Sequence, residues 1–157
     1  MPQPGRSTVR GPGPATLSLP GVGKAGIQIC YEIIFSGDVV DEKKRPDFIF
    51  NPSNDAWFGK WGPPQHLAQA RLRAAEEGIP VIRSTPTGIS AVIDAAGQVR
   101  NFVRWKGTGV IDAAIPPAAT KTTPFARLGN LIPLSIGFAL LILAIVLERR
   151  GRYRTNI

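Results

Sequence analysis

A chain of 157 residues is long enough for one domain with a real core and too short for two. Its single cysteine excludes an internal disulfide, and a hydrophobic content of 43% excludes disorder throughout. The net charge of +8 indicates an anionic partner, either nucleic acid or the surface of an anionic membrane. The sequence has no RNA-binding signature, zinc-ligand set or helix-turn-helix pattern, so we expect no nucleic acid as a partner.

The first third of the chain predicts an irregular start followed by strands. Residues 1–17 are rich in proline, glycine and arginine and form an irregular lead-in, and "ATLSLP" (15–20) predicts a short strand. The segment "KAGIQICYEIIF" (24–35) predicts a buried strand that opens into a turn and then a helix around Ser36–Glu42. "PDFIFNPS" (46–53) predicts a second buried strand, because a continuous apolar run is typical of a sheet covered on both faces.

The middle of the chain continues the alternation of helix and strand. "QHLAQARLRAAEEG" (65–78) predicts a helix that stops at Gly78. "IPVIRST" (79–85) and "ISAVIDAAGQV" (89–99) predict two strands, the second closed by an Ala-Gly turn, and "GTGVIDAAIP" (107–116) predicts one more. This pattern indicates an α/β fold.

An uncharged run near the C-terminus has the composition of a membrane helix. "LIPLSIGFALLILAIVL" (131–147) would form a helix of roughly 26 Å, at the short end of what spans a bilayer. The alternative is a buried core helix, but such a helix normally shows an amphipathic stripe, and this run has none. We therefore predict a membrane helix, with a linker before it at 119–130 and a basic tail after it at 148–157.

The flanking charges predict the direction in which that helix crosses the membrane. The last nine residues contain four arginines, Arg149, Arg150, Arg152 and Arg154, whereas the only basic residue in a similar length before the run is Arg127. The positive-inside rule then makes the C-terminus cytoplasmic and puts everything before Leu131 outside. The start of the sequence (1–14) has no apolar signal core and cannot drive export. We therefore expect the sequence to be truncated, with further membrane segments upstream of it.

The only cysteine, Cys30, lies where the first buried strand is predicted to end. Ligand sites of α/β sheets gather outside the carboxyl ends of strands, and a thiolate before a turn has a nucleophile and an oxyanion hole within one peptide unit. Taken alone, the cysteine is more typical of a small core hydrophobe. Glu32 shifts the balance, because alternation puts it on the same face as Cys30, and a buried carboxylate is costly unless it is paired or used.

Polar residues follow the second buried strand, namely Asn51, Ser53, Asn54 and Asp55. A parallel neighbouring strand would bring them to the same sheet edge as Cys30. Taken alone, an Asn-Asp pair is more typical of a turn than of a site.

Three aromatic residues, Trp57, Phe58 and Trp61, lie in the Gly/Pro-rich loop that continues from Asn54 and Asp55. Exposed aromatics beside a membrane helix can enter the lipid interface. We therefore predict that this loop faces substrate and lipid.

The only histidine, His66, begins the helix that follows this loop. Cysteine with histidine suggests a protease-like dyad. Helix capping or a structural hydrogen bond is an equally good interpretation of a histidine in this position.

Four segments in this order carry a specific resemblance, namely "GIQICYEIIF" (26–35), "FIFNPSNDAWFG" (48–59), "QHLAQARLRAAEEGIPVIRSTPTGISAVIDAAGQV" (65–99) and the apolar run (131–147). Together they resemble the C-terminal part of the bacterial apolipoprotein N-acyltransferases, a membrane family within the nitrilase (carbon–nitrogen hydrolase) superfamily. The ICYE motif indicates the superfamily, and "SNDAWFG" followed by "QHL" and "ARLRAAE" narrows it to the acyltransferases. The resemblance covers roughly residues 18–150.

The resemblance implies the C-terminal part of a nitrilase-type α-β-β-α sandwich at 18–118, followed by one transmembrane helix. The family uses a Glu–Lys–Cys triad whose cysteine lies in the ICYE motif, which implies that Cys30 is the nucleophile and that Tyr31 and Glu32 are important beside it. The family's glutamate and lysine lie well upstream, on segments that this sequence does not contain. Lys24 is the only lysine before Cys30, and its position excludes it as the triad lysine.

The resemblance also implies a reaction. An acyl chain would pass from a membrane phospholipid to the cysteine as a thioester, and then to the N-terminal amine of a diacylglyceryl-cysteine lipoprotein. The enzyme would lie in the bacterial inner membrane as a multi-pass protein with a periplasmic catalytic domain, and neither a metal nor another cofactor is expected.

Two alternatives stay open at this stage. One is a nitrilase- or amidase-type hydrolase that uses water as the acyl acceptor, which the apolar run argues against. The other is a truncated, membrane-tethered chain without activity, which the absent lysine and glutamate favour.

Overall fold

The computed structural model of the chain describes residue 11 and residues 13–154. Most of the predicted lead-in and the last three residues of the predicted basic tail lie outside these ranges. Side chains are described as far as residue 149.

A six-stranded mixed sheet forms the centre of the fold, with its strands in the order of the sequence. The inner pairs β2·β3 and β3·β4 are parallel, and the pairs β1·β2, β4·β5 and β5·β6 are antiparallel. The α/β class is as predicted. The strands are β1 (Thr16–Leu19), β2 (Gly23–Ile27), β3 (Phe48–Pro52), β4 (Val81–Ser84), β5 (Ser90–Ile93) and β6 (Val99–Val103).

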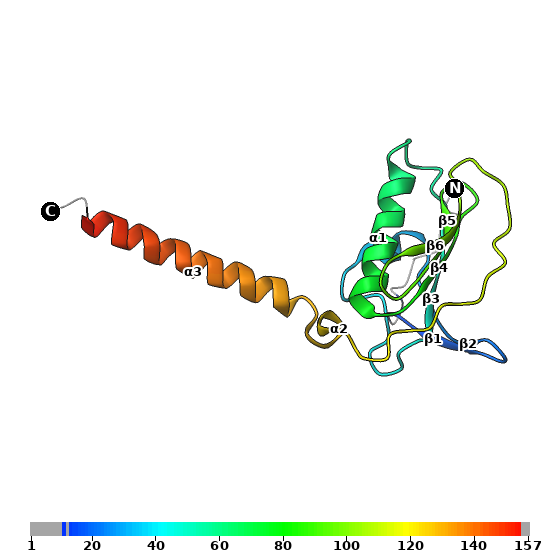
Figure 1. Cartoon of the computed structure of the whole chain (residues 1–157), viewed down its shortest axis with the longest axis horizontal. Coiled ribbons are helices and arrows are strands. Elements are labelled where there is room, and N and C mark those ends of the chain that lie inside the picture. Colours follow the sequence, from blue (N-terminus) through cyan, green and yellow to red (C-terminus); the bar gives the residue numbers. More distant parts are fainter. Residues whose placement is uncertain (1–10, 12, 155–157) are drawn as a thin grey trace, which may run out of the picture.

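Helix α1 (Gly62–Glu77) covers one face of this sheet (Figure 1). Ala70 and Ala74 of the helix and Ile49 and Val81 of the sheet are completely buried in one hydrophobic core. The helix starts three residues before the predicted position, because two prolines fit its first turn, where their missing N–H groups cost nothing. It ends as predicted at Gly78, whose φ of 65° is easily adopted only by a residue without a Cβ.

The segment around Cys30 differs from the prediction. The strand β2 ends at Ile27, and the chain then forms a short 3-10 helix, η1 (Cys30–Ile34). The helix predicted around Ser36–Glu42 is wrong, since these residues form turns and bends. Gly37 has a φ of 78°, and the Asp41 carboxylate accepts a hydrogen bond from the Lys43 N–H at 2.9 Å. Such local side-chain bonds compete with a helix.

The predicted hairpin after Ile93 is also different. The turn at Asp94–Gly97 leads into β6, which the sequence analysis missed, and the strand predicted at 107–116 is wrong because those residues have no regular structure. Val110 in this segment is 93% exposed. A strand needs a hydrogen-bonding partner, and β6 takes the position beside β5 that such a strand would need.

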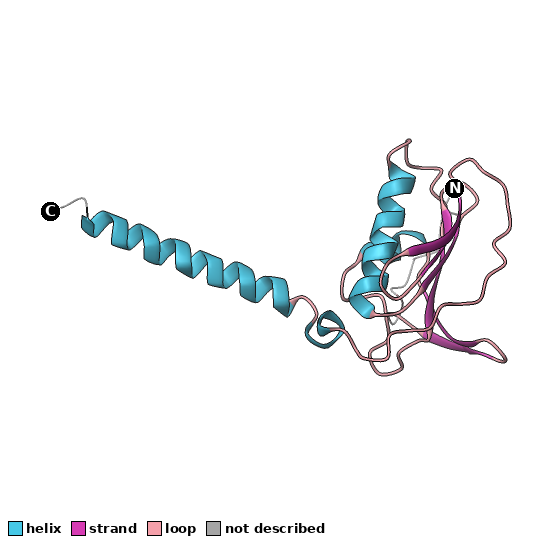
Figure 2. Cartoon of the chain, in the orientation of Figure 1, coloured by secondary structure: helices cyan, strands magenta, loops and turns pink. Residues whose placement is uncertain are grey.

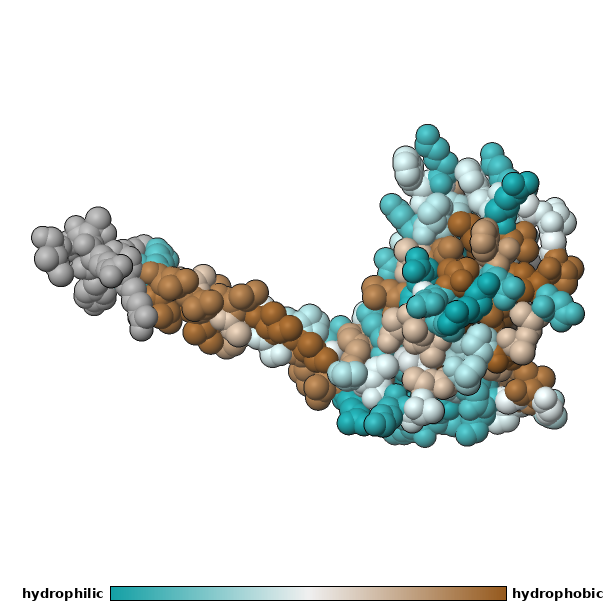
Figure 3. Space-filling model, in the orientation of Figure 1, coloured by the Kyte–Doolittle hydropathy of each residue, from teal (hydrophilic) through white to brown (hydrophobic). Residues whose placement is uncertain are grey.

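Two further helices follow, α2 (Pro124–Leu128) inside the predicted linker and α3 (Leu131–Arg154). Figures 1 and 2 show α3 projecting away from the sheet and α1. The part Leu131–Arg149 is long and apolar enough to cross a membrane, with a mean hydropathy of 2.5 and none of that window buried. Figure 3 shows its apolar surface continuing along the projecting helix. An apolar helix therefore forms over the whole of the predicted run.

Side chains attach the base of α3 to the rest of the protein. Thr123 caps α2 by accepting a hydrogen bond from Ala126, and its hydroxyl also donates to the Glu76 carbonyl at the end of α1. The Asn130 side-chain amide donates to the Ser36 carbonyl at 3.2 Å, two residues beyond η1. The base of α3 is therefore attached to the turn after η1 through Asn130 and to α1 by way of α2.

Candidate active site

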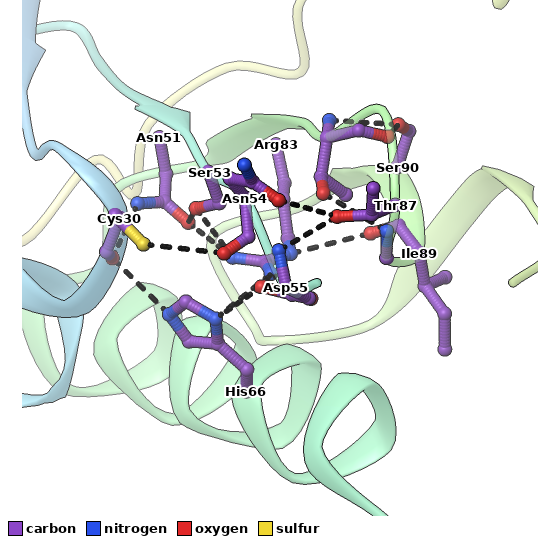
Figure 4. A network of polar contacts seen from close by, with 12 residues as sticks. Cys30, Asn51, Ser53, Asn54, Asp55, His66, Arg83, Thr87, Ile89 and Ser90 are labelled. Carbon is purple, nitrogen blue, oxygen red and sulfur yellow. Dashed lines mark hydrogen bonds and ion pairs between the residues drawn. The ribbon is translucent and has the colours of Figure 1, made fainter. Parts of the chain in front are cut away.

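The carboxyl ends of the three parallel strands meet at one sheet edge, where the polar residues of the chain gather (Figure 4). Cys30 follows β2, the segment Ser53–Asp55 follows β3, and Thr85 to Thr87 follow β4. Their meeting is the arrangement predicted for Cys30 and the polar cluster, and it is the usual location of a ligand site in an α/β sheet. Figure 4 shows side chains from all three segments converging.

Cys30 lies at a sharp turn rather than in an extended strand. Its φ is 51°, in the left-handed region that a residue with a side chain rarely adopts, at a cost of about 1–3 kcal/mol. The residue is partly exposed, and its Sγ lies 3.8 Å from the carbonyl oxygen of Asn54. Cys30 is therefore not a core hydrophobe, and the strained turn presents its thiol at the sheet edge.

Glu32 does not share a strand face with Cys30, so the alternation argument was wrong. Because the two residues belong to η1, the extended geometry on which that argument depended does not exist. The Glu32 carboxylate accepts a hydrogen bond from the Ile29 N–H at 2.6 Å and so closes the start of η1. In this structure it shapes the turn that carries the thiol.

Tyr31 belongs to a group of rings beside Cys30. It stacks on Phe58 with ring centroids 5.8 Å apart, and its centroid lies 5.8 Å from that of His66. These three rings line a small cavity of about 110 Å³ together with Ile34, Gly62, Gln65 and Gln69. Tyr31 itself is 51% exposed whereas His66 is buried, so the group extends from the surface into the interior.

His66 is buried, and both of its ring nitrogens have partners. Nδ1 lies 2.8 Å from Oδ1 of Asp55, and Nε2 lies 3.1 Å from the carbonyl oxygen of Cys30. Nε2 therefore contacts the backbone of Cys30 and not its sulfur. Of the two interpretations in the sequence analysis, the structural hydrogen bond agrees with this geometry and the protease-like dyad does not.

Arg83 is a buried hub that the sequence analysis missed. It projects from β4, and its guanidinium contacts Asp55 through Nη2, at 2.7 Å and 3.0 Å from the two carboxylate oxygens. Its Nη1 donates to Oδ1 of Asn51 at 2.5 Å and to the Ser53 hydroxyl at 3.0 Å. One signal could have identified it: an arginine two positions after Val81 falls on the core face of an alternating strand, where a charge needs partners.

The polar residues at the end of β3 and after it fall into two groups. Asn51 in β3 and Asp55 after it are buried, with relative exposures of 0% and 1%, so Asp55 does not face lipid as the loop prediction supposed. Asn54 is exposed, and its side-chain oxygen accepts a hydrogen bond from the Thr87 hydroxyl at 2.8 Å. The aromatic residues Trp57 and Trp61 are 85% and 71% exposed, as a lipid-facing loop requires.

The chain has relatives among known proteins. It is 46% identical over 134 residues to the apolipoprotein N-acyltransferase of Bradyrhizobium diazoefficiens, which covers 85% of this chain and 25% of that protein. It is 42% identical over 123 residues to the apolipoprotein N-acyltransferase of Rhodopseudomonas palustris, over 78% of this chain and 23% of that protein. The chain therefore spans about a quarter of the length of these curated relatives.

The fold and the family agree with these relatives. The structure superposes on an amidase from Nesterenkonia sp. with a TM-score of 0.51 at 21% identity, over 64% of this chain and 41% of the amidase, which shows a shared fold. The model of the carbon-nitrogen hydrolase family matches residues 2–125, most of the chain. On this match, the chain belongs to the carbon-nitrogen hydrolase family.

Proposed function

We propose that the chain carries the nucleophile of an apolipoprotein N-acyltransferase, and that Cys30 is this nucleophile. The observation that carries the proposal is the strained turn at Cys30, which presents a partly exposed thiol at the carboxyl edge of the parallel strands. Relatives at 46% and 42% identity have this name, and their matched region includes most of the chain. A strained nucleophile at a sheet edge is a recurrent device of acyl transfer.

The first step of the proposed reaction forms a thioester. The thiolate of Cys30 attacks the carbonyl carbon of a phospholipid ester, and the carbonyl π electrons move to its oxygen. Collapse of this tetrahedral intermediate breaks the bond to the glycerol oxygen, which leaves as lysophospholipid after taking a proton. The thioester divides one difficult transfer into two easier ones.

The second step transfers the acyl chain. The N-terminal amine of a diacylglyceryl-cysteine lipoprotein attacks the thioester carbonyl, an amide bond forms, and the Cys30 thiolate leaves. The amine loses a proton, so a general base is needed, and the developing oxyanion needs donors. In the resemblance described above, a glutamate and a lysine upstream of the ICYE motif have these roles. Tyr31 and Glu32 belong to the same motif, and Glu32 holds the turn in shape through the Ile29 N–H.

The membrane placement is part of the proposal. Helix α3 would cross the bacterial inner membrane, with the C-terminal arginines in the cytoplasm and the sheet in the periplasm. Its apolar surface, of which no part of the window is buried, supports this placement, because an apolar surface of this length is unfavourable in water. The exposed Trp57 and Trp61 would contact the lipid from which the acyl chain comes.

The test uses the complete reading frame in which these residues lie, in membranes that contain phospholipid with a labelled acyl chain. The expected result is a protein heavier by one acyl chain, with the label on Cys30, which moves to a diacylglyceryl-cysteine peptide when the peptide is added. Cys30→Ala abolishes both. Label released only as free fatty acid would favour the hydrolase, and a full-length protein that takes up no label would overturn the proposal. The same reading frame also shows whether a glutamate and a lysine precede Cys30.

A further inference from the structure

We propose that His66 and Asn51 are positioning residues that together orient the peptide between Cys30 and Tyr31 for acyl transfer. This inference rests on the proposed role of Cys30 as a nucleophile. It adds a function for the buried polar cluster of Asn51, Asp55, His66 and Arg83, whose side chains are not hydrogen-bonded to the sulfur.

Two side-chain donors converge on the carbonyl oxygen of Cys30. The Asn51 Nδ2 lies 3.1 Å from it and also donates to the Gln28 carbonyl at 2.6 Å. The His66 Nε2 lies 3.1 Å from the same oxygen. A carbonyl oxygen only accepts hydrogen bonds, so Nε2 must carry a proton. The two donors come from β3 and α1, so the carbonyl is held from two elements.

A single guanidinium orients both donors. Arg83 Nη1 donates to Oδ1 of Asn51, which fixes the direction of the amide and turns its NH₂ group toward Cys30. Arg83 Nη2 binds the Asp55 carboxylate and also lies 3.0 Å from Nδ1 of His66, which accepts a hydrogen bond from it in the ring whose proton is on Nε2; Asp55 lies 2.8 Å from the same nitrogen. Buried ion pairs contribute little to stability compared with an apolar core. A fully buried arginine beneath the turn is therefore explained better by the positions that it imposes than by stability.

The orientation of this peptide has a chemical consequence. The peptide is trans, as are all those in the described residues, so its N–H points away from its carbonyl oxygen. With the Cys30 carbonyl directed into the buried cluster, the Tyr31 N–H points outward on the opposite side. Within residues 13–154, no acceptor is bonded to this N–H. It is therefore free to donate to the oxyanion that forms when Sγ attacks a carbonyl carbon.

Two reagents separate this role from a merely structural one. Iodoacetamide alkylates the Cys30 thiolate by displacement of iodide, and no oxyanion forms. p-Nitrophenyl acetate acetylates the same sulfur through a tetrahedral oxyanion, releasing p-nitrophenolate and leaving a thioester, while the thiol proton goes to the buffer. Because Cys30 is the only cysteine of the chain, the detergent-solubilised 157-residue protein reports on this residue alone.

A matched pair of variants tests the donor. His66→Leu removes the side-chain donor to the Cys30 carbonyl, so the Tyr31 N–H is displaced but not lost. Complete loss of an oxyanion donor costs about 10²–10³ in rate, and we expect this displacement to slow acetylation by about tenfold or more. Alkylation by iodoacetamide should stay within about twofold. In His66→Gln an amide N–H reaches the Cys30 carbonyl from nearly the same place, so most of the acetylation rate returns. Leu72→Gln, at a half-exposed position of the same helix, controls for a change on α1.

The other outcomes overturn the inference. Equal slowing of both reagents in His66→Leu indicates a structural role only. Unchanged acetylation in that variant, or acetylation of the unaltered chain no faster than that of free cysteine, shows that the peptide supplies no oxyanion donor. Failure of the proposed function is distinguishable, because it removes labelling by phospholipid while the contrast between the two reagents persists.

Discussion

The Arg83 guanidinium and the Asp55 carboxylate form an ion pair with no solvent exposure of either side chain, Nη2 lying 2.7 Å from Oδ2. Each charge is compensated chiefly by the other. Removing one partner leaves an unpaired charge in the interior, whereas the two together are tolerated.

We expect Arg83→Met to lower the free energy of unfolding by about 3–5 kcal/mol, because Asp55 then lacks its counter-charge. Equilibrium unfolding in urea measures this loss. The double variant Arg83→Met with Asp55→Leu removes both charges and should recover part of the stability. A double variant less stable than Arg83→Met would contradict the assignment of the loss to an uncompensated carboxylate.

Gly88 makes room for the same carboxylate. A Cβ at this position would lie 2.1 Å from Oδ2 of Asp55, and Asp55 is fully buried and cannot move away freely. We expect Gly88→Ala to cost about 1–3 kcal/mol of unfolding free energy by overpacking. We also expect it to slow acetylation of Cys30, because the displaced Asp55 no longer orients His66. Gly59→Ala is the matched control, since nothing lies within 4 Å of its added Cβ. Equal effects of the two alanines would contradict this account.

Asp94 predicts a pH dependence of stability. Burial raises the pKa of this carboxyl, but hydrogen bonds from the Gln98 and Ala96 N–H groups and the charge of Arg100 outweigh it, so the pKa lies below its ordinary value. The ionised Asp94 carboxylate therefore stabilises the fold fully at a pH above the ordinary aspartate pKa of about 3.9. This stabilisation disappears as the pH falls through the lower pKa of the folded state.

The measurement for Asp94 is the unfolding free energy of the native chain and of Asp94→Asn between pH 7 and pH 2. The native chain should be more stable at pH 7, and the difference should shrink only below about pH 4. A difference that stays constant over the whole range would show that the charge of Asp94 contributes nothing.

The exposed tryptophans predict a specific defect with lipid substrates. The double variant Trp57→Ala with Trp61→Ala should lower labelling of the full-length protein by phospholipid by about a hundredfold or more, since each buried aromatic contributes roughly 1.5–3 kcal/mol and about 1.4 kcal/mol is a factor of ten. Its acetylation by p-nitrophenyl acetate, which needs no lipid contact, should stay unchanged. Phe102→Ala, at an exposed aromatic position on β6, is the control. Unchanged labelling by phospholipid would remove the loop from the lipid contact.

Local sequence patterns were sufficient for most of the fold. The apolar runs at β3 and β4 report burial directly, and Gly78 marks a helix end, so these two strands and the end of α1 form where the patterns predict them. The turn at Cys30 could not be predicted in this way. Its φ of 51° is held by donors on Asn51 and His66, which are 21 and 36 residues away in the sequence. No local pattern contains that information.

The candidate site was predictable in location but not in detail. The order of the parallel strands was enough to bring Cys30 and the polar cluster to one edge. The part played by Arg83 was not visible, because its partners come from β3, the loop after it, α1 and the segment before β5. The helix predicted at Ser36–Glu42 failed because turns stabilised by Gly37 and Asp41 replace it.

The attachment at the base of α3 has a consequence for reach. Asn130 holds the Ser36 carbonyl, and Thr123 at the start of α2 holds the last turn of α1, so the apolar helix is attached to the turn after η1 and, by way of α2, to α1. With α3 in a bilayer, this attachment would hold the thiol at a fixed height above the membrane surface. The acyl ester of the phospholipid would then have to move out of the bilayer toward the sulfur, or the protein would have to insert into the headgroup layer. The height of the thiol above the membrane would thus determine which carbonyl carbon of the lipid it can reach.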